Sequence, residues 1–235
     1  MAHRPLRRLA GRLAAVIAFV GSAAGANEVA CDRECLIGRS AVSLIRLRAA
    51  ANQVHEVETI VAREGTASLF APEAMTTPDV LFEQEVAPAR RASRADMIAI
   101  ANSYYEGIVR ADPSLVPAAA GCYRVENGVQ TQRIPSLVKA GHCNAGHGSF
   151  GYITPIRNRR FPLVDPERGL VLALTIMDIR PAAAVHSVDG HLQQAARSPR
   201  SILVGELFKI VDRKIRRMEV VMRDVESGAV SGWSD

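Results

Sequence analysis

The fold is decided by the stretch RNRRFPLVDPERGLVLALTIMD, which runs from Arg157 to Asp178. A basic segment leads into an acidic turn at residues 165–169, and an apolar segment follows it. Residues 170–179 are apolar at both even and odd positions, which is typical of a strand covered on both faces. The stretch therefore predicts a buried central strand that ends near a single carboxylate, Asp178.

A strong helix is predicted upstream of this strand. Ser93 and Asp96 have the spacing of a capping box, and apolar side chains then recur at helical spacing. Asp112-Pro113 ends the helix, because proline lacks the amide hydrogen that the helical ladder needs.

A long hairpin is predicted downstream, from strands at residues 202–211 and 214–225. Its turn falls at Asp212-Arg213, and arginine at positive φ costs about 1 kcal/mol, so we expect a turn of more than two residues. The other segments around the central strand are a strand at 150–161 broken near Pro155, an irregular excursion at 118–148 and a loop at 181–199.

The segment before the strong helix resembles a shortened copy of the later unit. Residues 32–50 predict a helix and residues 54–63 a strand. The apolar positions of 54–61 match those of 215–222, with Glu58 on Glu219, although two amphipathic strands also match by chance. The predicted parts are a signal peptide at 1–26, a truncated first repeat at 27–66, a linker at 67–92 and a complete α+β domain at 93–235.

The first 26 residues predict a secretory signal peptide. Four arginines precede an apolar run at residues 13–20, and small residues end the leader at Ala26. An uncleaved anchor is the alternative, although the run is short for a membrane span. Removal of the four arginines lowers the net charge from +5 to +1. We therefore expect a secreted or periplasmic protein with no nucleic-acid partner, no membrane partner after leader cleavage and no cofactor.

The cysteines of the mature chain are Cys31, Cys35, Cys122 and Cys143. In an exported protein they predict disulfides, and proximity favours one bridge within the first two and one within the last two. Spacing alone leaves all three pairings open. A metal site formed by the last two cysteines with His142 and His147 is the alternative, but its spacing fits no standard zinc pattern.

Several segments together resemble an exported family of unknown function found in bacteria and fungi, over most of residues 31–233. The order of helix, irregular loop, bent strand pair and long hairpin is similar to the nuclear transport factor 2-like (SnoaL-like) cone folds. The resemblance implies a curved, mostly antiparallel sheet wrapped around a helix, with a pocket inside. The family shows Asp-His after the central strand, whereas this chain has Asp178-Ile179. The segments that carry the resemblance are 99–107 (AIANSYYEG), 124–130 (RVENGVQ), 159–169 (RRFPLVDPERG), 206–210 (ELFKI) and 231–233 (SGW).

Asp178 is the first candidate for catalysis. A carboxylate at the end of an apolar strand is desolvated, which suits a general base. His147 and Tyr104 are the candidates to support it, as a proton shuttle and as a polar group on an aromatic wall. Tyr105 is adjacent on the helix, so we expect only one tyrosine to face inward. The alternative is that Asp178 pairs with a nearby arginine such as Arg157.

Three further residues are candidates for ligand binding: Arg160, Glu206 and His142. Arg160 has the chemistry to hold an anion, although it also has partners in the acidic turn at 165–167. Glu206 interrupts an apolar row, so it either faces a pocket or pairs across the hairpin with Arg217. His142 lies in a Gly-rich loop with no visible carboxylate partner.

The sequence therefore supports two main functions. The first is an acid–base lyase, isomerase or hydrolase that acts on a small, partly apolar compound. The second is a non-catalytic ligand-binding or dimerisation module, in which apolar surface left by the truncated repeat meets a second copy. A non-functional relic of a truncated gene is a third interpretation. No nucleophile motif, phosphate-binding loop, dinucleotide fingerprint or metal-ligand motif is present.

Overall fold

A computed structural model describes residues 14–16, 40–50, 53–67, 69–77, 79–131, 143–144, 146–181, 186–188, 191–193 and 198–232. Its centre is a curved six-stranded sheet in which every neighbouring pair is antiparallel except β4 and β11. The strands in spatial order are β5 (Val129–Gln130), β4 (Ala118–Glu126), β11 (Lys214–Val225), β10 (Arg200–Val211), β7 (Leu170–Ile179) and β6 (Ile153–Asp165). The predicted α+β class with a curved, mostly antiparallel sheet is confirmed.

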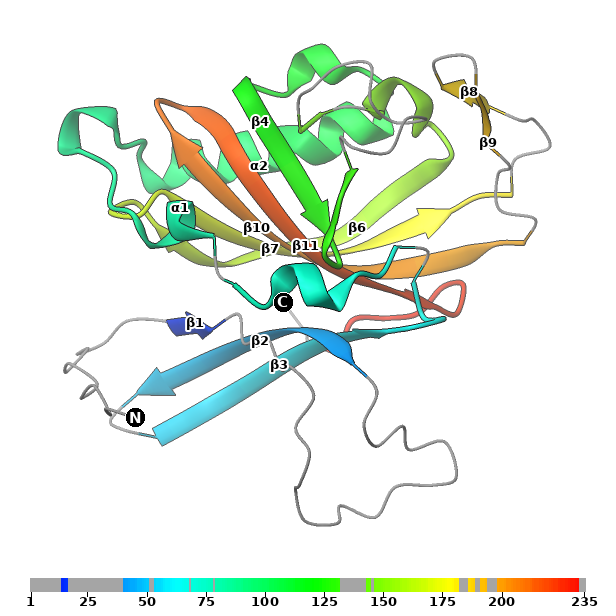
Figure 1. The fold of residues 1–235 in the computed structure, drawn as a ribbon, viewed down its shortest axis with the longest axis horizontal. Coiled ribbons are helices and arrows are strands. Elements are labelled where there is room, and N and C mark those ends of the chain that lie inside the picture. Colours follow the sequence, from blue (N-terminus) through cyan, green and yellow to red (C-terminus); the bar gives the residue numbers. More distant parts are fainter. Residues whose placement is uncertain are drawn as a thin grey trace.

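The predicted helix is α2 (Arg94–Val109), which lies across the concave face of the sheet (Figure 1). Ser93 caps it, because its hydroxyl accepts a bond from the Asp96 amide at 3.1 Å and donates to the Asp96 carboxylate at 2.8 Å. Tyr104 and Tyr105 are both buried, contrary to the expectation that only one faces inward. The sheet curves around α2, so more than one side of the helix is covered.

The central strand β7 has the predicted length and is buried from Val171 to Met177. Its odd-numbered side chains pack with α2 in the inner core. Leu172 and Leu174 belong to a second apolar core on the outer face. Asp178 has the parity of these outer-face leucines, which decides where its carboxylate lies.

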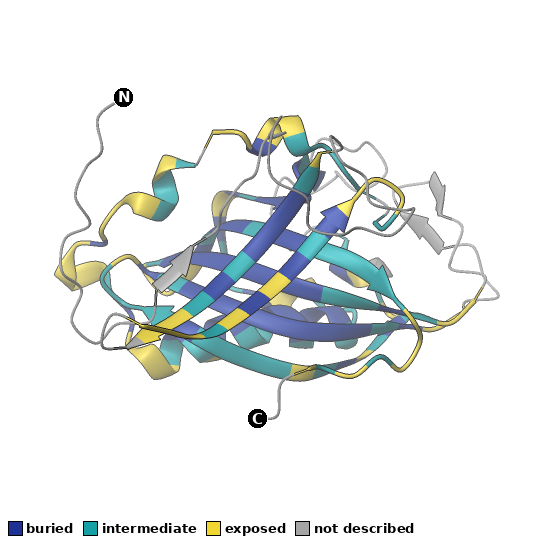
Figure 2. Cartoon of the chain, turned by 90° about the horizontal axis from the view of Figure 1, so that it is seen from below, coloured by how far each residue is buried: buried dark blue, intermediate teal, exposed yellow. Residues whose placement is uncertain are grey.

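The outer core is closed by a hairpin of β2 (Ala41–Ala50) and β3 (Gln53–Arg63), which lies beneath the sheet in Figure 1 and crosses it in Figure 2. The helix predicted for residues 32–50 is therefore wrong over residues 41–50. In that segment Val42 and Leu44 alternate with side chains of the opposite face, and this period of two prevails over the looser helical spacing.

The hairpin fits closely onto the sheet at Gly205 of β10. A Cβ atom at this position would lie 2.6 Å from Cδ1 of Leu44 and 3.2 Å from Cδ1 of Ile60. At the sheet edge, Arg160 of β6 forms an ion pair with Glu58 of β3. The segment thus forms a full outer layer, and no helix of a truncated repeat appears among its described residues. The hairpin covers the apolar outer face of the sheet, so an uncovered apolar face is no longer a reason to expect a homodimer.

In the segment predicted as a linker, residues 67–92, the Met75 and Val86 side chains are buried. It contains η1 (Pro72–Met75), α1 (Val80–Glu83) and η2 (Pro88–Arg90). Lys209 of β10 is buried below and donates to the carbonyl oxygens of Gln84 at 2.5 Å and Arg168 at 2.6 Å. We call residues 69–92 the strap.

Two connections differ from the prediction. Residues 118–126 form β4 rather than an irregular excursion, because β11 provides a partner distant in sequence. The β10–β11 turn consists of Asp212 and Arg213 alone, with φ values of 53° and 57°. Ion pairs from Arg90 to Asp212 at 2.5 Å and from Arg213 to Asp96 at 2.7 Å offset part of the backbone cost.

The predicted break in β6 near Pro155 is a register shift between Ile153 and Ile156, and the strand continues to Asp165.

The remaining elements are short or lie at the N-terminus. The strand β1 (Ala14–Val16) pairs with β2 and lies within the predicted leader, whose other residues, like Cys31 and Cys35, are outside the described ranges. The other elements are η3 (Pro113–Leu115), η6 (His147–Ser149), β8 (His186–Val188) and β9 (His191–Gln193). No helix in the described part of the chain has the length and hydropathy to cross a bilayer.

Candidate functional site: a cavity inside the cone

A cavity of about 370 Å³ lies between α2 and the concave face of the sheet. That volume is within the usual range for small-molecule sites. Its apolar lining consists of Leu69, Ile108, Phe150, Ile153, Met177, Ile179, Ile202, Val204, Val220 and Met222. Its polar lining consists of Tyr104, Arg124, Glu126, Tyr152, Arg200 and Glu206. We call this space the cone cavity.

Glu206 is the buried carboxylate of the cone cavity. It lies on the inner face of β10, and the residue is only 2% exposed. Its Oε2 atom has no hydrogen-bond partner among the described residues. Burial raises the pKa of Glu206 to about 7, while the nearby Tyr105 hydroxyl and Arg124 guanidinium oppose that rise. The carboxyl group can therefore take up or release a proton near neutral pH.

Arg124 is a fully buried cation on β4 beside this carboxyl group. Its Nη1 atom donates to the Tyr104 hydroxyl at 2.7 Å and to the Cys143 carbonyl oxygen at 3.0 Å, and Nε lies 2.6 Å from Oε1 of Glu126. Burial lowers the pKa of Arg124, but Glu126, Tyr104 and Glu206 together outweigh this effect and the net shift is upward. The guanidinium thus stays charged inside the cone.

Tyr104 has a free hydrogen-bond donor. Its oxygen accepts the bond from Arg124, so its own O–H must point elsewhere, and no described residue accepts it. The tyrosine lines the cone cavity, and burial raises the pKa of Tyr104, so the proton stays on the hydroxyl. A substrate oxygen in the cavity can accept this hydrogen bond, which the neighbouring cation strengthens.

His147 touches Tyr104, with ring centroids 4.6 Å apart, but does not line the cone cavity. It is fully buried, and neither ring nitrogen has a hydrogen-bond partner among the described residues. Burial, helped by the charge of Arg124, lowers the pKa of His147 to about 3, so the ring is neutral at pH 7. Its packing against Tyr104 and Phe150 suits a structural role better than proton transfer. The predicted Cys122–Cys143 disulfide is confirmed.

Asp178 lies outside the cone cavity. Arg157 binds its carboxylate with contacts of 2.8 and 3.1 Å, and the Ser201 hydroxyl donates to it at 2.7 Å. The hydrogen bond from Arg157 lowers the pKa of Asp178, which keeps the group ionised. This is the ion-pair alternative of the sequence analysis, and it leaves no unpaired base at the end of β7.

The structure separates the three predicted binding residues. Glu206 faces the cone cavity rather than pairing with Arg217. Arg160 bridges to Glu58 on the outer face, so it meets neither a cavity ligand nor the acidic turn at 165–167. His142 lies outside the described residues.

Four polar residues of the cone cavity are not candidates from the sequence alone: Arg124, Glu126, Tyr152 and Arg200. Arg124 and Glu126 lie on β4. The signal in the sequence is that Cys122, Arg124 and Glu126 are two residues apart, so all three side chains lie on one face once β4 is recognised as a strand.

The described residues contain no cluster of histidine, cysteine and carboxylate side chains able to hold a metal ion.

Comparison with known proteins gives a family but no activity. A family model described as "Domain of unknown function (DUF8021)" matches residues 90–222. No curated protein matches the chain.

Three solved structures are similar in fold over part of the chain. A putative hydroxylase, AclR from Streptomyces galilaeus, has 15% identity and a TM-score of 0.38 over 56% of this chain and 81% of that one. PrhC from Penicillium brasilianum has 12% identity and a TM-score of 0.33 over 56% and 82%. The Mtr2–Mex67 M domain complex of C. albicans has 12% identity and a TM-score of 0.32 over 59% and 97%. We draw no conclusion about activity from these similarities.

Proposed function

This chain belongs to the DUF8021 family, whose function is unknown, and we propose that its cone cavity is an active site for acid–base catalysis. The substrate is a small, partly apolar carbonyl compound. Glu206 is the base, in place of Asp178, and Tyr104 is the hydrogen-bond donor to the carbonyl oxygen. Arg124 positions Tyr104 and supplies positive charge behind it.

The observation that carries this proposal is the position of Glu206. It lies in a mostly apolar cavity with one oxygen atom unpaired, and Tyr104, whose proton is also unpaired, lines the same cavity. A buried polar atom without a partner costs about 1–3 kcal/mol, and a bound substrate would supply the missing contacts.

The chemistry needs no co-reactant. The C–H bond next to the substrate carbonyl breaks, and Glu206 takes the proton. The electron pair moves onto the carbonyl oxygen, where the enolate accepts a hydrogen bond from Tyr104. Return of the proton to another carbon gives an isomerase, and departure of a leaving group from the next carbon gives a lyase.

The first prediction tests this with cyclohexanone, a small apolar ketone. We expect the protein to accelerate exchange of its α-protons in D2O, measured by NMR. The rate should increase as the pH rises through about 7, because only the ionised form of Glu206 is a base. Glu206→Gln should reduce the catalysed rate at least about 100-fold, the scale of a general base.

The matched control is Asp178→Asn, a carboxylate on the same sheet but outside the cone cavity. It should keep the exchange rate, although it loses an ion pair. Exchange by Glu206→Gln at the wild-type rate would contradict the assignment. Saturable ketone binding without exchange would instead support the alternative, a non-catalytic ligand-binding module, which the apolar lining also suits.

Export belongs to the same proposal. The Cys122–Cys143 disulfide suits an oxidising compartment, and the leader has the order of charge, apolar run and small residues that directs secretion. The second prediction is that intact mass spectrometry of the exported protein gives a chain that begins at Asn27. A chain that keeps its first 26 residues in the exported fraction would contradict cleavage.

A further inference from the structure

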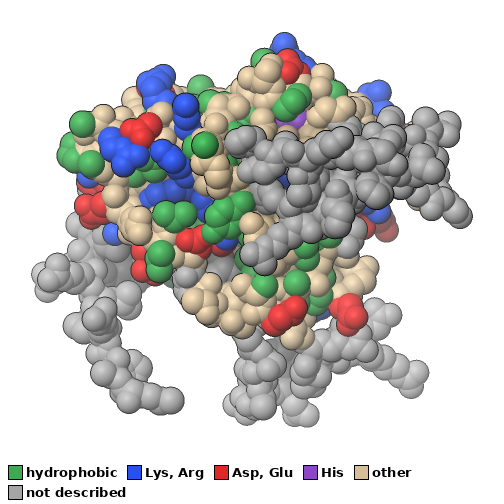
Figure 3. Space-filling view, turned by 45° about the horizontal axis from the view of Figure 1, so that its top comes forward, with side chains coloured by type: hydrophobic (Ala, Val, Ile, Leu, Met, Phe, Trp, Pro, Cys, Tyr) green, Lys and Arg blue, Asp and Glu red, His purple; other side chains and the backbone are tan. Residues whose placement is uncertain are grey.

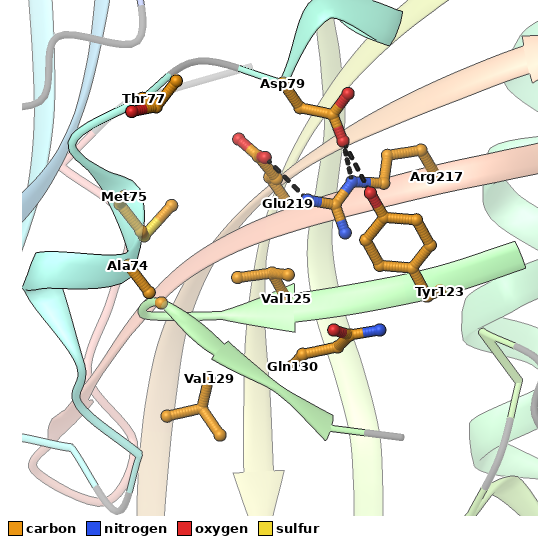
Figure 4. Close-up of a pocket in the computed structure, with 11 residues that line it drawn as sticks. Ala74, Met75, Thr77, Asp79, Tyr123, Val125, Val129, Gln130, Arg217 and Glu219 are labelled. Atoms are coloured by element: carbon orange, nitrogen blue, oxygen red, sulfur yellow. Dashed lines mark hydrogen bonds and ion pairs between the residues drawn. The ribbon is translucent and has the colours of Figure 1, made fainter. Parts of the chain in front are cut away.

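A second cavity, of about 520 Å³, lies on the outer side of the sheet at its β4–β5 edge. Tyr123 and Val125 of β4 line it, together with Arg217 and Glu219 of β11, and the strap closes it from above (Figure 4). The cavity shares no lining residue with the cone cavity, because the side chains come from opposite faces of the same strands. We call it the outer cavity.

Four charged and polar side chains form one wall of the outer cavity. Asp79 accepts a hydrogen bond from the Tyr123 hydroxyl at 2.8 Å and lies 2.7 Å from Nε of Arg217. Nη2 of Arg217 donates to Oε1 of Glu219 at 3.1 Å, and the guanidinium stacks on the Tyr123 ring at 3.6 Å. These contacts fix the plane of the guanidinium group.

The wall leaves one donor and one acceptor unused. Arg217 is only 5% exposed, and its Nη1 atom has no hydrogen-bond partner among the described residues. Figure 4 shows this third nitrogen turned toward the space near Val125 and Gln130. Oε2 of Glu219 has no hydrogen-bond partner among the described residues, and burial raises the pKa of Glu219.

The charges of the wall decide which ligand fits. Asp79 and Glu219 carry two negative charges against one positive charge on Arg217, so a carboxylate ligand meets net repulsion. A cation would leave the Nη1 donor without an acceptor. A neutral group with a carbonyl beside an N–H satisfies both unused positions.

We propose that the outer cavity binds a neutral, planar amide-type molecule such as a carboxamide or lactam. Its carbonyl oxygen accepts from Nη1 of Arg217, and its N–H donates to Glu219. Its apolar body packs on Met75, Val125 and Val129, which are among the other lining residues.

Benzamide is the probe, with benzoate and acetophenone as isosteric controls that lack the N–H donor. Each compound is titrated into the full-length protein while NMR follows the Gln130 side-chain amide and the methyl groups of Val125 and Val129. Benzamide should shift all these signals with one binding curve. Both controls should bind at least about tenfold more weakly, because each leaves a buried polar group unpaired.

Two variants test the assignment of the ligand groups. Glu219→Gln removes one negative charge and offers a donor, so it should reverse the preference and bind benzoate more tightly than benzamide. Val129→Trp fills the outer cavity and should abolish binding of both, with an unchanged methyl spectrum elsewhere as the check of folding. Equal affinity for the three compounds, no shift at millimolar benzamide, or shifts confined to Ile202 and Met222 of the cone cavity would overturn the proposal.

Discussion

Two buried titratable side chains of the inner core, Glu206 and His147, should give the protein opposite dependences of stability on pH. Burial raises the pKa of Glu206 from 4.5 to about 7, so between these values the folded state holds a proton that the unfolded state has lost. Stability from Glu206 therefore falls as pH rises, by about 1.4 kcal/mol per unit. Burial lowers the pKa of His147 from 6.5 to about 3, so its contribution rises with pH at the same slope below 6.5.

The third prediction follows from this opposition between pH 4.5 and 6.5. The two slopes cancel in the wild-type protein, so each single variant should reveal the other residue. Glu206→Gln should become more stable as pH rises across this window, by about 3 kcal/mol, and His147→Leu should become less stable by a similar amount. Urea denaturation at four pH values measures both trends. Parallel curves for the two variants would show that at least one group is not buried as described.

At the scale of elements, the β2–β3 hairpin packs closely on the sheet at Gly205. The fourth prediction is that Gly205→Ala destabilises the protein by about 1–3 kcal/mol, because the new methyl group meets Leu44, Ile60 and Leu174. In a Leu44→Ala background the same change should cost less, since the nearest neighbour is gone. A double-mutant cycle in urea measures this coupling. Gly151→Ala is the control, because the nearest atom outside its chain neighbours, Cβ of Ala111, lies 3.9 Å from the new Cβ. Strictly additive effects would contradict the proposed contact.

The same scale shows why some elements were predicted and others were not. α2 and β7 carry local signals, a capping box and an unbroken apolar run, so their bounds followed from sequence. β4 contains Ala-Ala-Ala-Gly and becomes a strand through its parallel pairing with β11, about 100 residues later. The candidate site was also only partly predictable from the sequence. Glu206 was recognised as an interruption of an apolar row, but Asp178 was favoured because period two cannot tell the concave face from the outer one.

The face of the molecule in Figure 3 carries both signs of charge, which fits the net charge of +1 expected if the leader is removed. Lysine and arginine side chains gather on the left of the face in Figure 3, but acidic side chains lie among them. Ion pairs such as Arg90–Asp212 and Arg213–Asp96 join charges of opposite sign. The absence of a nucleic-acid partner stays a prediction, and it rests on this mixing of charges rather than on net charge alone.

The last prediction concerns the two-core architecture of the whole molecule. The outer face of the sheet depends on the β2–β3 hairpin for its cover, so a chain that begins at residue 67 should expose an apolar patch. Each uncovered side chain costs about 2 kcal/mol of burial, and the patch should drive self-association. Light scattering after size exclusion should show a monomeric 27–235 chain, as the control, and an associated or aggregated 67–235 chain. A 67–235 chain that stays monomeric with an unchanged Tm would mean that the β2–β3 hairpin is not needed for folding or for covering the sheet. The patch in question consists of Leu163, Leu172, Leu174, Leu207 and Val221.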